Sequence, residues 1–316
     1  MTDAPKKLML LDTASLYFRA FFGVPGTMRA PDGFPVNAIR GLLDFITRLV
    51  ENHGPTELVA CWDDDWRPAW RVALVPTYKQ HRLADPAGVN PANANAETVP
   101  DELAMQVPVI REALASLGIP VIGAVGCEAD DVIGTLATRS SIPVDIVTGD
   151  RDLFQLVDDA RNVRVLYTVK GGVGNAAIMD EAAVFEKYGV PASLYADFAT
   201  MRGDTSDGLP GVAGVGDKTA ASLVTSYGDL AAIRAAAADP TTGLSPTIRR
   251  KLLDASDYLD NAVTVVAVLR NAELELPPTG LGLPSAPVDP DMWAALDKQF
   301  DLGSSARRLE AVLAGR

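Results

Sequence analysis

The chain has 316 residues, enough for one large domain or two modest ones, and 48% hydrophobic with 22% charged residues is ordinary for a folded protein. The net charge of −13, taken alone, disfavours a nucleic-acid partner, because phosphate binding usually leaves a basic footprint, unless many acids converge on bound cations. No apolar stretch is long enough for a signal peptide or a membrane span, so we expect a cytoplasmic protein with no membrane partner. The spacing of Cys61 and Cys127 is not that of a zinc site and predicts reduced thiols.

The first half of the sequence alternates short apolar strands with amphipathic helices, a pattern that predicts an α/β fold with a mostly parallel sheet. In chain order we expect strand Lys7–Leu11, helix Asn37–Asn52, strand Leu58–Trp62, helix Asp101–Leu117, strand Ile119–Ile122, helix Glu128–Ser140, and strands Val144–Thr148 and Val163–Tyr167. Pro108 either kinks its helix or marks the true start. Ala84–Val99 lacks periodicity and predicts a mobile loop. After Asp180 only helical patterns remain, and Pro277–Asp289 leads to a final helical pair.

Three predicted strands are each followed by acids: Asp12, Asp63, and Asp150 with Asp152. The carboxyl ends of strands in an open parallel sheet lie at one edge, where functional groups collect. A single acid after a strand is usually a turn residue, but recurrence at three strands favours a shared site. Asp64 and Asp65 follow Asp63 directly, so which of the three points inward stays open.

Two further acidic groups lie outside the strand ends: Glu128, Asp130 and Asp131 at a helix start, and Asp204 and Asp207 before a glycine-rich turn. Acids at helix starts are often caps or dipole partners. Gathered in one pocket, however, all nine acids would need cations, and carboxylate oxygens suit Mg²⁺ or Mn²⁺. Zinc would need His and Cys ligands, and His53 and His81 lie away from this set. Two hard cations about 4 Å apart can activate water and stabilise the leaving oxygen of a phosphodiester.

Four sequence blocks make the interpretation more specific. LLDTASLYFRAFF, GCEADDVIGTLA, TGDRDLFQLV and RGDTSDGLPGVAGVGDKTAASLV together resemble the 5′-nuclease, or flap endonuclease, family, which includes the 5′-3′ exonuclease domain of bacterial DNA polymerase I. The blocks span most of the chain, which is similar to a stand-alone form without an attached polymerase. The resemblance implies a PIN-like fold: a central, mostly parallel sheet with flanking helices, followed by a C-terminal helical region with a helix–hairpin–helix (helix-three-turn-helix) element.

The resemblance also implies a division of the chain and a set of site residues. We expect a catalytic core at 1–180, with an arch or loop at about 67–100, and a helical DNA-binding region at 181–316, with the hairpin at about 204–228. The implied ligands for two or three Mg²⁺ or Mn²⁺ ions are Asp12, Asp63, Glu128, Asp130, Asp131, Asp150, Asp152, Asp204 and Asp207. The implied catalytic residues are Asp12, Asp63, Asp130, Asp150, Asp152, Lys79 and Arg82.

Two segments are expected to hold DNA. The basic-aromatic stretch from Arg67 to Arg82 corresponds to the family's arch, whose expected DNA contacts are Arg71, Tyr78, Lys79 and Arg82; the alternative is a solvated charged helix. The hairpin offers free N–H groups to phosphates at a helix start through Gly211, Gly214, Gly216, Lys218 and Thr219. The resemblance implies a K⁺ ion on backbone carbonyls there, at Val212 and Val215. Gly208 replaces the polar residue that is common in the family after the second Asp of the DxxD pair, and the effect of this difference stays open.

The expected function is hydrolysis of phosphodiesters at 5′ ends and at single-strand/duplex junctions of DNA and RNA primers, leaving a 5′-phosphate and a 3′-hydroxyl. The family's setting implies primer removal and repair, a monomer, and a DNA polymerase or sliding clamp as protein partner. Two alternatives are a DNA-structure binding module that does not cut and a PIN-like ribonuclease. The balance between exonuclease and flap endonuclease activity stays open.

Overall fold

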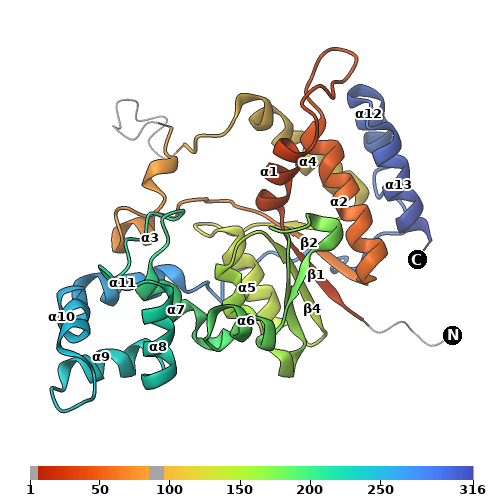
Figure 1. Ribbon diagram of the computed structural model, residues 1–316. Coiled ribbons are helices and arrows are strands. Elements are labelled where there is room, and N and C mark those ends of the chain that lie inside the picture. Colours follow the sequence, from red (N-terminus) through yellow and green to blue (C-terminus); the bar gives the residue numbers. More distant parts are fainter. Residues whose placement is uncertain (1–5, 85–95, 316) are drawn as a thin grey trace.

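A six-stranded sheet forms the centre of the first half of the molecule (Figure 1). The computed structural model describes residues 6–84 and 96–315. The strand order is β3-β2-β1-β4-β5-β6, and every neighbouring pair is parallel except β5 with β6. The strands are β1 (Leu8–Asp12), β2 (Glu57–Cys61), β3 (Val121–Ile122), β4 (Val144–Thr148), β5 (Val163–Tyr167) and β6 (Ala177–Met179).

Helices cover both faces of the sheet because its central strands are apolar on both sides. All five residues of β1 are buried, and successive side chains point to opposite faces, so Met9 and Leu11 pack in one core while Leu8 and Leu10 pack in the other. The first core lies under α1 (Thr13–Gly23), α2 (Asn37–His53) and α4 (Asp101–Leu117). The second lies under α5 (Ala129–Arg139) and α6 (Glu181–Tyr188).

The second half is helical. After α6 the chain forms α7 (Tyr195–Arg202), α8 (Asp217–Tyr227), α9 (Leu230–Ala238), α10 (Pro246–Asp254) and α11 (Ser256–Val266). A short helix of the first half, α3 (Ala69–Leu74), lies between β2 and α4 in the sequence. The last pair, α12 (Pro290–Phe300) and α13 (Gly303–Ala314), returns to the first half, where α12 packs on α4 and α13 on α2 (Figure 1). A return segment, residues 265–272, runs from the end of α11 along α5.

The predicted strands and helices are confirmed to within two residues at each end. Pro108 lies inside α4, which begins at Asp101, so it does not mark the start of that helix. The antiparallel β6 was not predicted, because three residues are too few for a periodic signal. Residues 85–95 of the predicted loop lie outside the described residues. Both cysteines are buried free thiols, as expected. Within the described ranges, no helix is long and apolar enough to cross a membrane.

Candidate active site and metal centre

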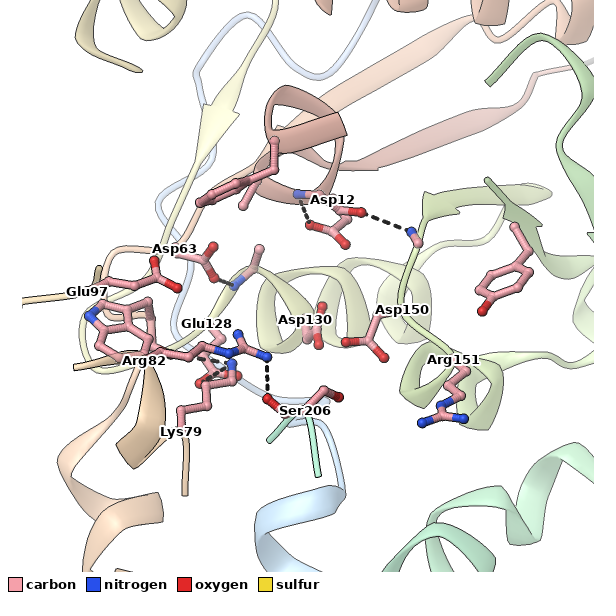
Figure 2. Close-up of a pocket in the computed structure, with 17 residues that line it drawn as sticks. Asp12, Asp63, Lys79, Arg82, Glu97, Glu128, Asp130, Asp150, Arg151 and Ser206 are labelled. Atoms are coloured by element: carbon pink, nitrogen blue, oxygen red, sulfur yellow. Dashed lines mark hydrogen bonds and ion pairs between the residues drawn. The ribbon is translucent and has the colours of Figure 1, made fainter. Parts of the chain in front are cut away.

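A cavity of about 420 Å³ opens where β1, β2 and β4 end (Figure 2). Asp12 at the end of β1 is in register with Cys61 at the end of β2, and β4 ends beside them at Thr148, so the acids that follow these strands converge. Among the described residues, six acidic side chains line the cavity: Asp12, Asp63, Glu97, Glu128, Asp130 and Asp150. Three cationic side chains of the same part of the chain line it too: Lys79, Arg82 and Arg151.

Asp12 is fixed by two hydrogen bonds at the end of β1. Its carboxylate accepts one from the backbone N–H of Ser15 at 3.1 Å, which caps α1, and one from the Thr148 hydroxyl at 2.6 Å. Burial raises the pKa of Asp12 to about 7, and the charge of Asp63 adds to this, while the hydrogen bond from Thr148 opposes it. A carboxylate in this setting is stabilised in its charged form by a bound cation.

Asp63 is the one of three consecutive acids that faces the cavity. Its carboxylate accepts a hydrogen bond from the backbone N–H of Ala129 at 2.7 Å, which holds it against the start of α5. The Asp64 carboxylate lies 3.9 Å from the guanidinium of Arg111, and the Asp65 carboxylate accepts a hydrogen bond from the backbone N–H of Arg67. Neither of these two lines the cavity, so the ambiguity at this strand end resolves in favour of Asp63.

The start of α5 sends its acids in different directions. Glu128 lines the cavity, where it accepts a hydrogen bond from the Tyr78 hydroxyl at 2.9 Å and forms an ion pair with Lys79 at 3.0 Å. Asp130 also lines the cavity, and burial, with the charge of Asp150, raises its pKa well above the usual range. Burial raises the pKa of Glu128 to about 7 against the opposing charge of Lys79.

Asp131 is turned into the protein instead. It is 0% exposed, closes a capping box with the backbone N–H of Glu128 at 3.1 Å, and accepts two hydrogen bonds from Arg71 at 2.7 and 2.8 Å. It also accepts the backbone N–H of Leu269 at 2.9 Å. The expectation that Asp131 is a metal ligand is therefore corrected: the carboxylate does not line the cavity and its oxygens are engaged inside the protein.

Asp150 and Asp152 follow β4 and differ in how they are satisfied. Asp150 lines the cavity and accepts the backbone N–H of Asp152 at 2.8 Å. Asp152 begins the short helix η3 (Asp152–Leu156), and its Oδ1 is buried with no hydrogen-bond partner among the described residues. Burial, followed by the charge of Asp150, raises the pKa of Asp152 well above the usual range. A buried acceptor without a donor indicates that a ligand belongs there.

Asp204 and Asp207, in the loop after α7, already have cationic partners. Asp204 forms an ion pair with Arg151 at 2.9 Å and accepts the backbone N–H of Ser206 at 2.8 Å. Burial pushes its pKa up, but the hydrogen bonds from Ser206 and the charge of Arg151 outweigh burial and lower it. Asp207 pairs with Arg82 at 2.9 Å. Neither acid lines the cavity, so each would have to exchange an arginine for a metal ion.

The donor chemistry of the cavity fits hard divalent cations. Within the described ranges no three acidic, histidine or cysteine side chains stand close enough to form a finished metal site. The cavity acids are nevertheless all oxygen donors, and no described side chain forms an ion pair with Asp12, Asp130, Asp150 or Asp152. Of these four carboxylates, Asp12 and Asp152 are buried and Asp130 and Asp150 half-buried. Neighbouring carboxylates without a cationic partner fit Mg²⁺ or Mn²⁺.

Lys79 and Arg82 lie at the cavity, as the sequence predicted (Figure 2). Lys79 adopts a left-handed backbone conformation with φ of 48°, and its backbone N–H donates to the Asp207 carbonyl at 2.8 Å. Arg82 donates to the Ser206 carbonyl at 2.6 Å. The loop that carries Asp207 therefore positions both cations. Gly208 explains part of this contact, because its φ is +70° and a Cβ there would collide with the Thr77 carbonyl.

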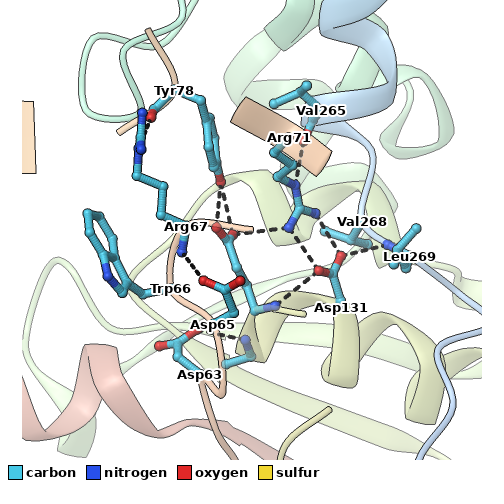
Figure 3. A network of polar contacts seen from close by, with 12 residues as sticks. Asp63, Asp65, Trp66, Arg67, Arg71, Tyr78, Asp131, Val265, Val268 and Leu269 are labelled. Atoms are coloured by element: carbon cyan, nitrogen blue, oxygen red, sulfur yellow. Dashed lines mark hydrogen bonds and ion pairs between the residues drawn. The ribbon is translucent and has the colours of Figure 1, made fainter. Parts of the chain in front are cut away.

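Arg71 and Tyr78 require a correction. The basic-aromatic stretch was expected to present both to DNA, but Arg71 is 2% and Tyr78 3% exposed (Figure 3). The Arg71 guanidinium is paired with Asp131, and the Tyr78 ring is buried with its hydroxyl on Glu128. Their burial comes from α5 and α11, which are distant in sequence and cover this stretch.

Two charged lining residues were not predicted from the sequence. Glu97 follows the undescribed part of the loop and forms an antiparallel bridge with Leu83, which turns its carboxylate to the cavity. Burial raises its pKa, and the charge of Asp63 adds to this. Arg151, between Asp150 and Asp152, also lines the cavity. The DRD motif could have suggested a role for Arg151, whereas nothing in the loop composition marks Glu97.

Residues 203–216 link α7 to α8 as a tight hairpin. Gly211 and Gly214 have φ of 67° and 72°, and a Cβ on Gly211 would collide with the backbone of Arg202. Gly216 caps α8, whose first turn contains the exposed Lys218 and the half-buried Thr219. The free N–H groups of this helix start can donate hydrogen bonds to a phosphate.

The backbone carbonyls of the hairpin are partly engaged. The side chains of Val212 and Val215 are buried, and the Val212 carbonyl accepts the backbone N–H of Val215 at 2.9 Å. The Lys251 ammonium donates to the Gly214 carbonyl at 2.9 Å, so the hairpin already holds one cationic group.

Comparison with known proteins decides the family. Residues 7–189 match the model of the 5′-3′ exonuclease N-terminal resolvase-like domain, and residues 190–288 match that of the 5′-3′ exonuclease C-terminal SAM fold. The chain belongs to the 5′-3′ exonuclease family. A 5′-3′ exonuclease of Streptomyces coelicolor is 59% identical over 305 residues, 96% of this chain and 99% of the relative. DNA polymerase I of Mycobacterium bovis is 42% identical over 231 residues, 72% of this chain but 24% of the polymerase.

Solved structures confirm the fold. A bacteriophage T5 flap endonuclease, in a pseudo-enzyme-product complex with DNA and metal ions, superimposes with a TM-score of 0.62 at 16% identity, over 98% of this chain and 100% of that one. The predicted family and the predicted PIN-like architecture with a helical C-terminal region are both confirmed by these matches.

Proposed function

We propose that this member of the 5′-3′ exonuclease family hydrolyses phosphodiesters of DNA at 5′ ends and at the junction of a 5′ flap with a duplex. The observation that carries the proposal is the group of carboxylates without a cationic partner at the carboxyl edge of the sheet: Asp12, Asp130 and Asp150 at the cavity and, outside its lining, Asp152 with its unsatisfied Oδ1. The T5 flap endonuclease, a structural neighbour in complex with DNA and metal ions, supports it.

The residues that would hold two or three Mg²⁺ or Mn²⁺ ions are the cavity acids Asp12, Asp63, Glu128, Asp130 and Asp150. Asp152, which does not line the cavity but has an unsatisfied Oδ1, would join them, as would Asp204 and Asp207 if these release their arginines. When bound, such ions lower the pKa of a water molecule and neutralise charge on the leaving oxygen. The products would be a 5′-phosphate and a 3′-hydroxyl.

The chain's own cations bind and orient the substrate. Lys79 and Arg82 are the cavity cations that can contact the scissile phosphate, and Arg82 can exchange Asp207 for it. A lysine held at the cavity by Glu128 is placed to stabilise the negative charge that grows on the phosphate oxygens in the transition state. Arg151 offers a third cation on the other side of Asp150.

The hairpin would hold the duplex. Gly211, Gly214, Gly216, Lys218 and Thr219 are the proposed contacts, since the first turn of α8 presents free N–H groups and Lys218 is exposed. A K⁺ ion on the carbonyls of Val212 and Val215 belongs to the same proposal. So do RNA primers as substrate, a polymerase or sliding clamp as partner, a monomeric state, and a cytoplasmic role in primer removal and repair.

The test is cleavage of an end-labelled 5′-flap duplex with Mg²⁺, with Mn²⁺, and with EDTA. We expect incision close to the junction with either ion, none with EDTA, and a nick that DNA ligase seals when the flap is removed, which reports the 5′-phosphate and 3′-hydroxyl. Tight binding without incision in either ion would support the non-cutting module instead. Faster cleavage of an all-RNA flap duplex than of DNA would support the ribonuclease alternative.

A further inference from the structure

Arg71 and Asp131 form a buried ion pair that the proposed chemistry does not use (Figure 3). Arg71 lies on α3 and Asp131 in the first turn of α5, and they are 2% and 0% exposed. Two parallel hydrogen bonds of 2.7 and 2.8 Å join the guanidinium to the two carboxylate oxygens. A bidentate pair of this kind fixes orientation as well as distance.

The same two side chains also hold the return segment. The Arg71 Nε donates to the carbonyl of Val265 at 3.2 Å, and the backbone N–H of Leu269 donates to Asp131 at 2.9 Å. With the capping bond from the N–H of Glu128, Asp131 accepts four hydrogen bonds, two on each oxygen. An ionised carboxylate has about four lone-pair positions, so none is left for a metal ion.

The pair is one contact away from the cavity. Arg71 Nη1 lies 3.4 Å from the Glu128 carboxylate, which also accepts the Tyr78 hydroxyl and pairs with Lys79. Glu128 and Lys79 both line the cavity, whereas Arg71 and Asp131 do not. A shift of the guanidinium would therefore move two cavity groups together.

The pair is equally close to the part of the chain that carries the hairpin. Val265 is in the last turn of α11, which packs against α7, and the Tyr258 hydroxyl of α11 donates to the Thr200 carbonyl of α7 at 3.1 Å. Residue 203, where the hairpin begins, follows α7 directly. One buried ion pair thus connects α3, the start of α5 and α11, and α11 packs against α7, which leads into the hairpin.

We infer that Arg71 and Asp131 are positioning residues, which set Glu128 and Lys79 at the cavity in register with the helical region that holds the duplex. The inference rests on the proposed nuclease function and deepens it. A buried pair is a weak source of stability, since apolar side chains of similar size often replace one without loss, but its fixed geometry specifies one arrangement of the groups around it.

The first test replaces Arg71 with lysine, which keeps the positive charge but removes the fork. Arg164→Lys is the matched control, because Arg164 holds the buried Asp145 at 2.7 Å at the opposite edge of the sheet. We expect Arg71→Lys to lower the single-turnover cleavage rate of the flap duplex by about 100-fold, as a misplacement of about 1 Å can do. Its DNA dissociation constant and the salt dependence of binding should stay as in the unaltered protein. Arg164→Lys should leave all three measurements unchanged.

The second test keeps the inference falsifiable if Arg71→Lys does not fold. Tyr78→Phe removes only the hydroxyl on Glu128, and we expect it to slow the single-turnover rate by about tenfold, the value of one hydrogen bond to a charged group, with DNA binding unchanged. Asp131→Asn should slow the reaction with DNA binding unchanged, and the double variant with Arg71→Lys should be no slower than the slower single variant.

Two outcomes would overturn the inference. One is folded Arg71→Lys and Tyr78→Phe proteins that cleave at full rate. The other is an Arg71→Lys protein whose DNA dissociation constant rises as much as its cleavage rate falls, which would indicate that Arg71 contacts DNA. If the unaltered chain cleaves no flap with Mg²⁺ or Mn²⁺, the proposed function itself fails, which is a separate result.

Discussion

The aspartates at the two ends of β4 differ in whether they form ion pairs with cationic side chains. Asp145, near the start of the strand, is 2% exposed and paired with Arg164 at 2.7 Å and Lys7 at 3.4 Å. Asp150 and Asp152, just past the other end, form no ion pair with any described side chain, and burial together with neighbouring acids raises the pKa of both.

The difference separates an acid that serves the fold from acids that serve chemistry. A buried charge without a partner costs folding free energy, whereas a paired one roughly breaks even. A protein that keeps unpaired carboxylates at one edge of its sheet retains them for a ligand, and shifted pKa values cluster at such sites. Four predictions test this contrast, from the largest expected effect to the smallest.

Asp152→Asn should reduce flap cleavage by about 1,000-fold or more, because it removes a negative oxygen from the centre of charge stabilisation. DNA binding should be retained. The same change should raise the melting temperature in EDTA, since it removes a charge that other acids repel. Single-turnover kinetics and calorimetry measure the two effects. Full activity, or a lower melting temperature with EDTA, would show that Asp152 is a structural acid like Asp145.

Lys79→Ala should slow the chemical step by about 100-fold, through loss of a cation at the developing phosphate charge. The flap duplex should still bind within a few-fold of the unaltered protein. Rapid-quench measurement of a single turnover gives the rate. Lys187→Ala is a suitable control, because Lys187, on α6, lies over the rings of Tyr167 and Tyr188 and does not itself line the cavity. An unchanged rate in Lys79→Ala would remove this residue from the mechanism.

Asp145→Asn should leave cleavage unchanged and lower the free energy of unfolding by about 2 kcal/mol, the cost of weakening buried charge-assisted hydrogen bonds. Urea unfolding at one pH measures the change. The two variants should therefore differ in sign: Asp145→Asn should destabilise the protein, whereas Asp152→Asn should stabilise it in EDTA. A loss of activity here, in protein shown to be folded, would mean that the two edges of the sheet are not functionally distinct.

The metal-free protein should be more stable at about pH 6 than at about pH 8. The pKa values of Asp12 and Glu128 are about 7 in the folded chain, above those of an unfolded chain, so folding binds protons and stability falls as pH rises through 7. The melting temperature should change by a few degrees, and Mn²⁺ should raise it more at the higher pH. Asp12→Asn should flatten the profile; an unaltered pH profile in that variant would contradict the assigned cause.

The sequence predicted the acids of the site better than the groups around them. Asp12, Asp63 and Asp150 could be placed together because parallel strands end at one edge of a sheet. Asp131 could not be separated from Glu128, since three-residue spacing puts both on one helical face. The capping box, Arg71 and the backbone N–H of Leu269 together hold Asp131 inside the protein.

The basic-aromatic stretch shows that burial by distant helices could not be predicted from the sequence either. Arg71 and Tyr78 look like surface residues in a charged run, and their burial depends on α5 and α11, which no local pattern reports. Glu97 reaches the cavity through a single bridge to Leu83 across the loop, again a contact without a local signal.

The return segment ties the two matched regions of the family into one folding unit. Their models meet between residues 189 and 190, yet Leu269 from the second completes the hydrogen bonds of Asp131 and lies against Gly134, where a Cβ would collide with its carbonyl. A fragment ending at 189 would expose the apolar side of α5 and leave Asp131 with fewer donors. The two separate fragments should therefore fold only when they are mixed. A protease cut within one region of the intact chain should unfold both regions.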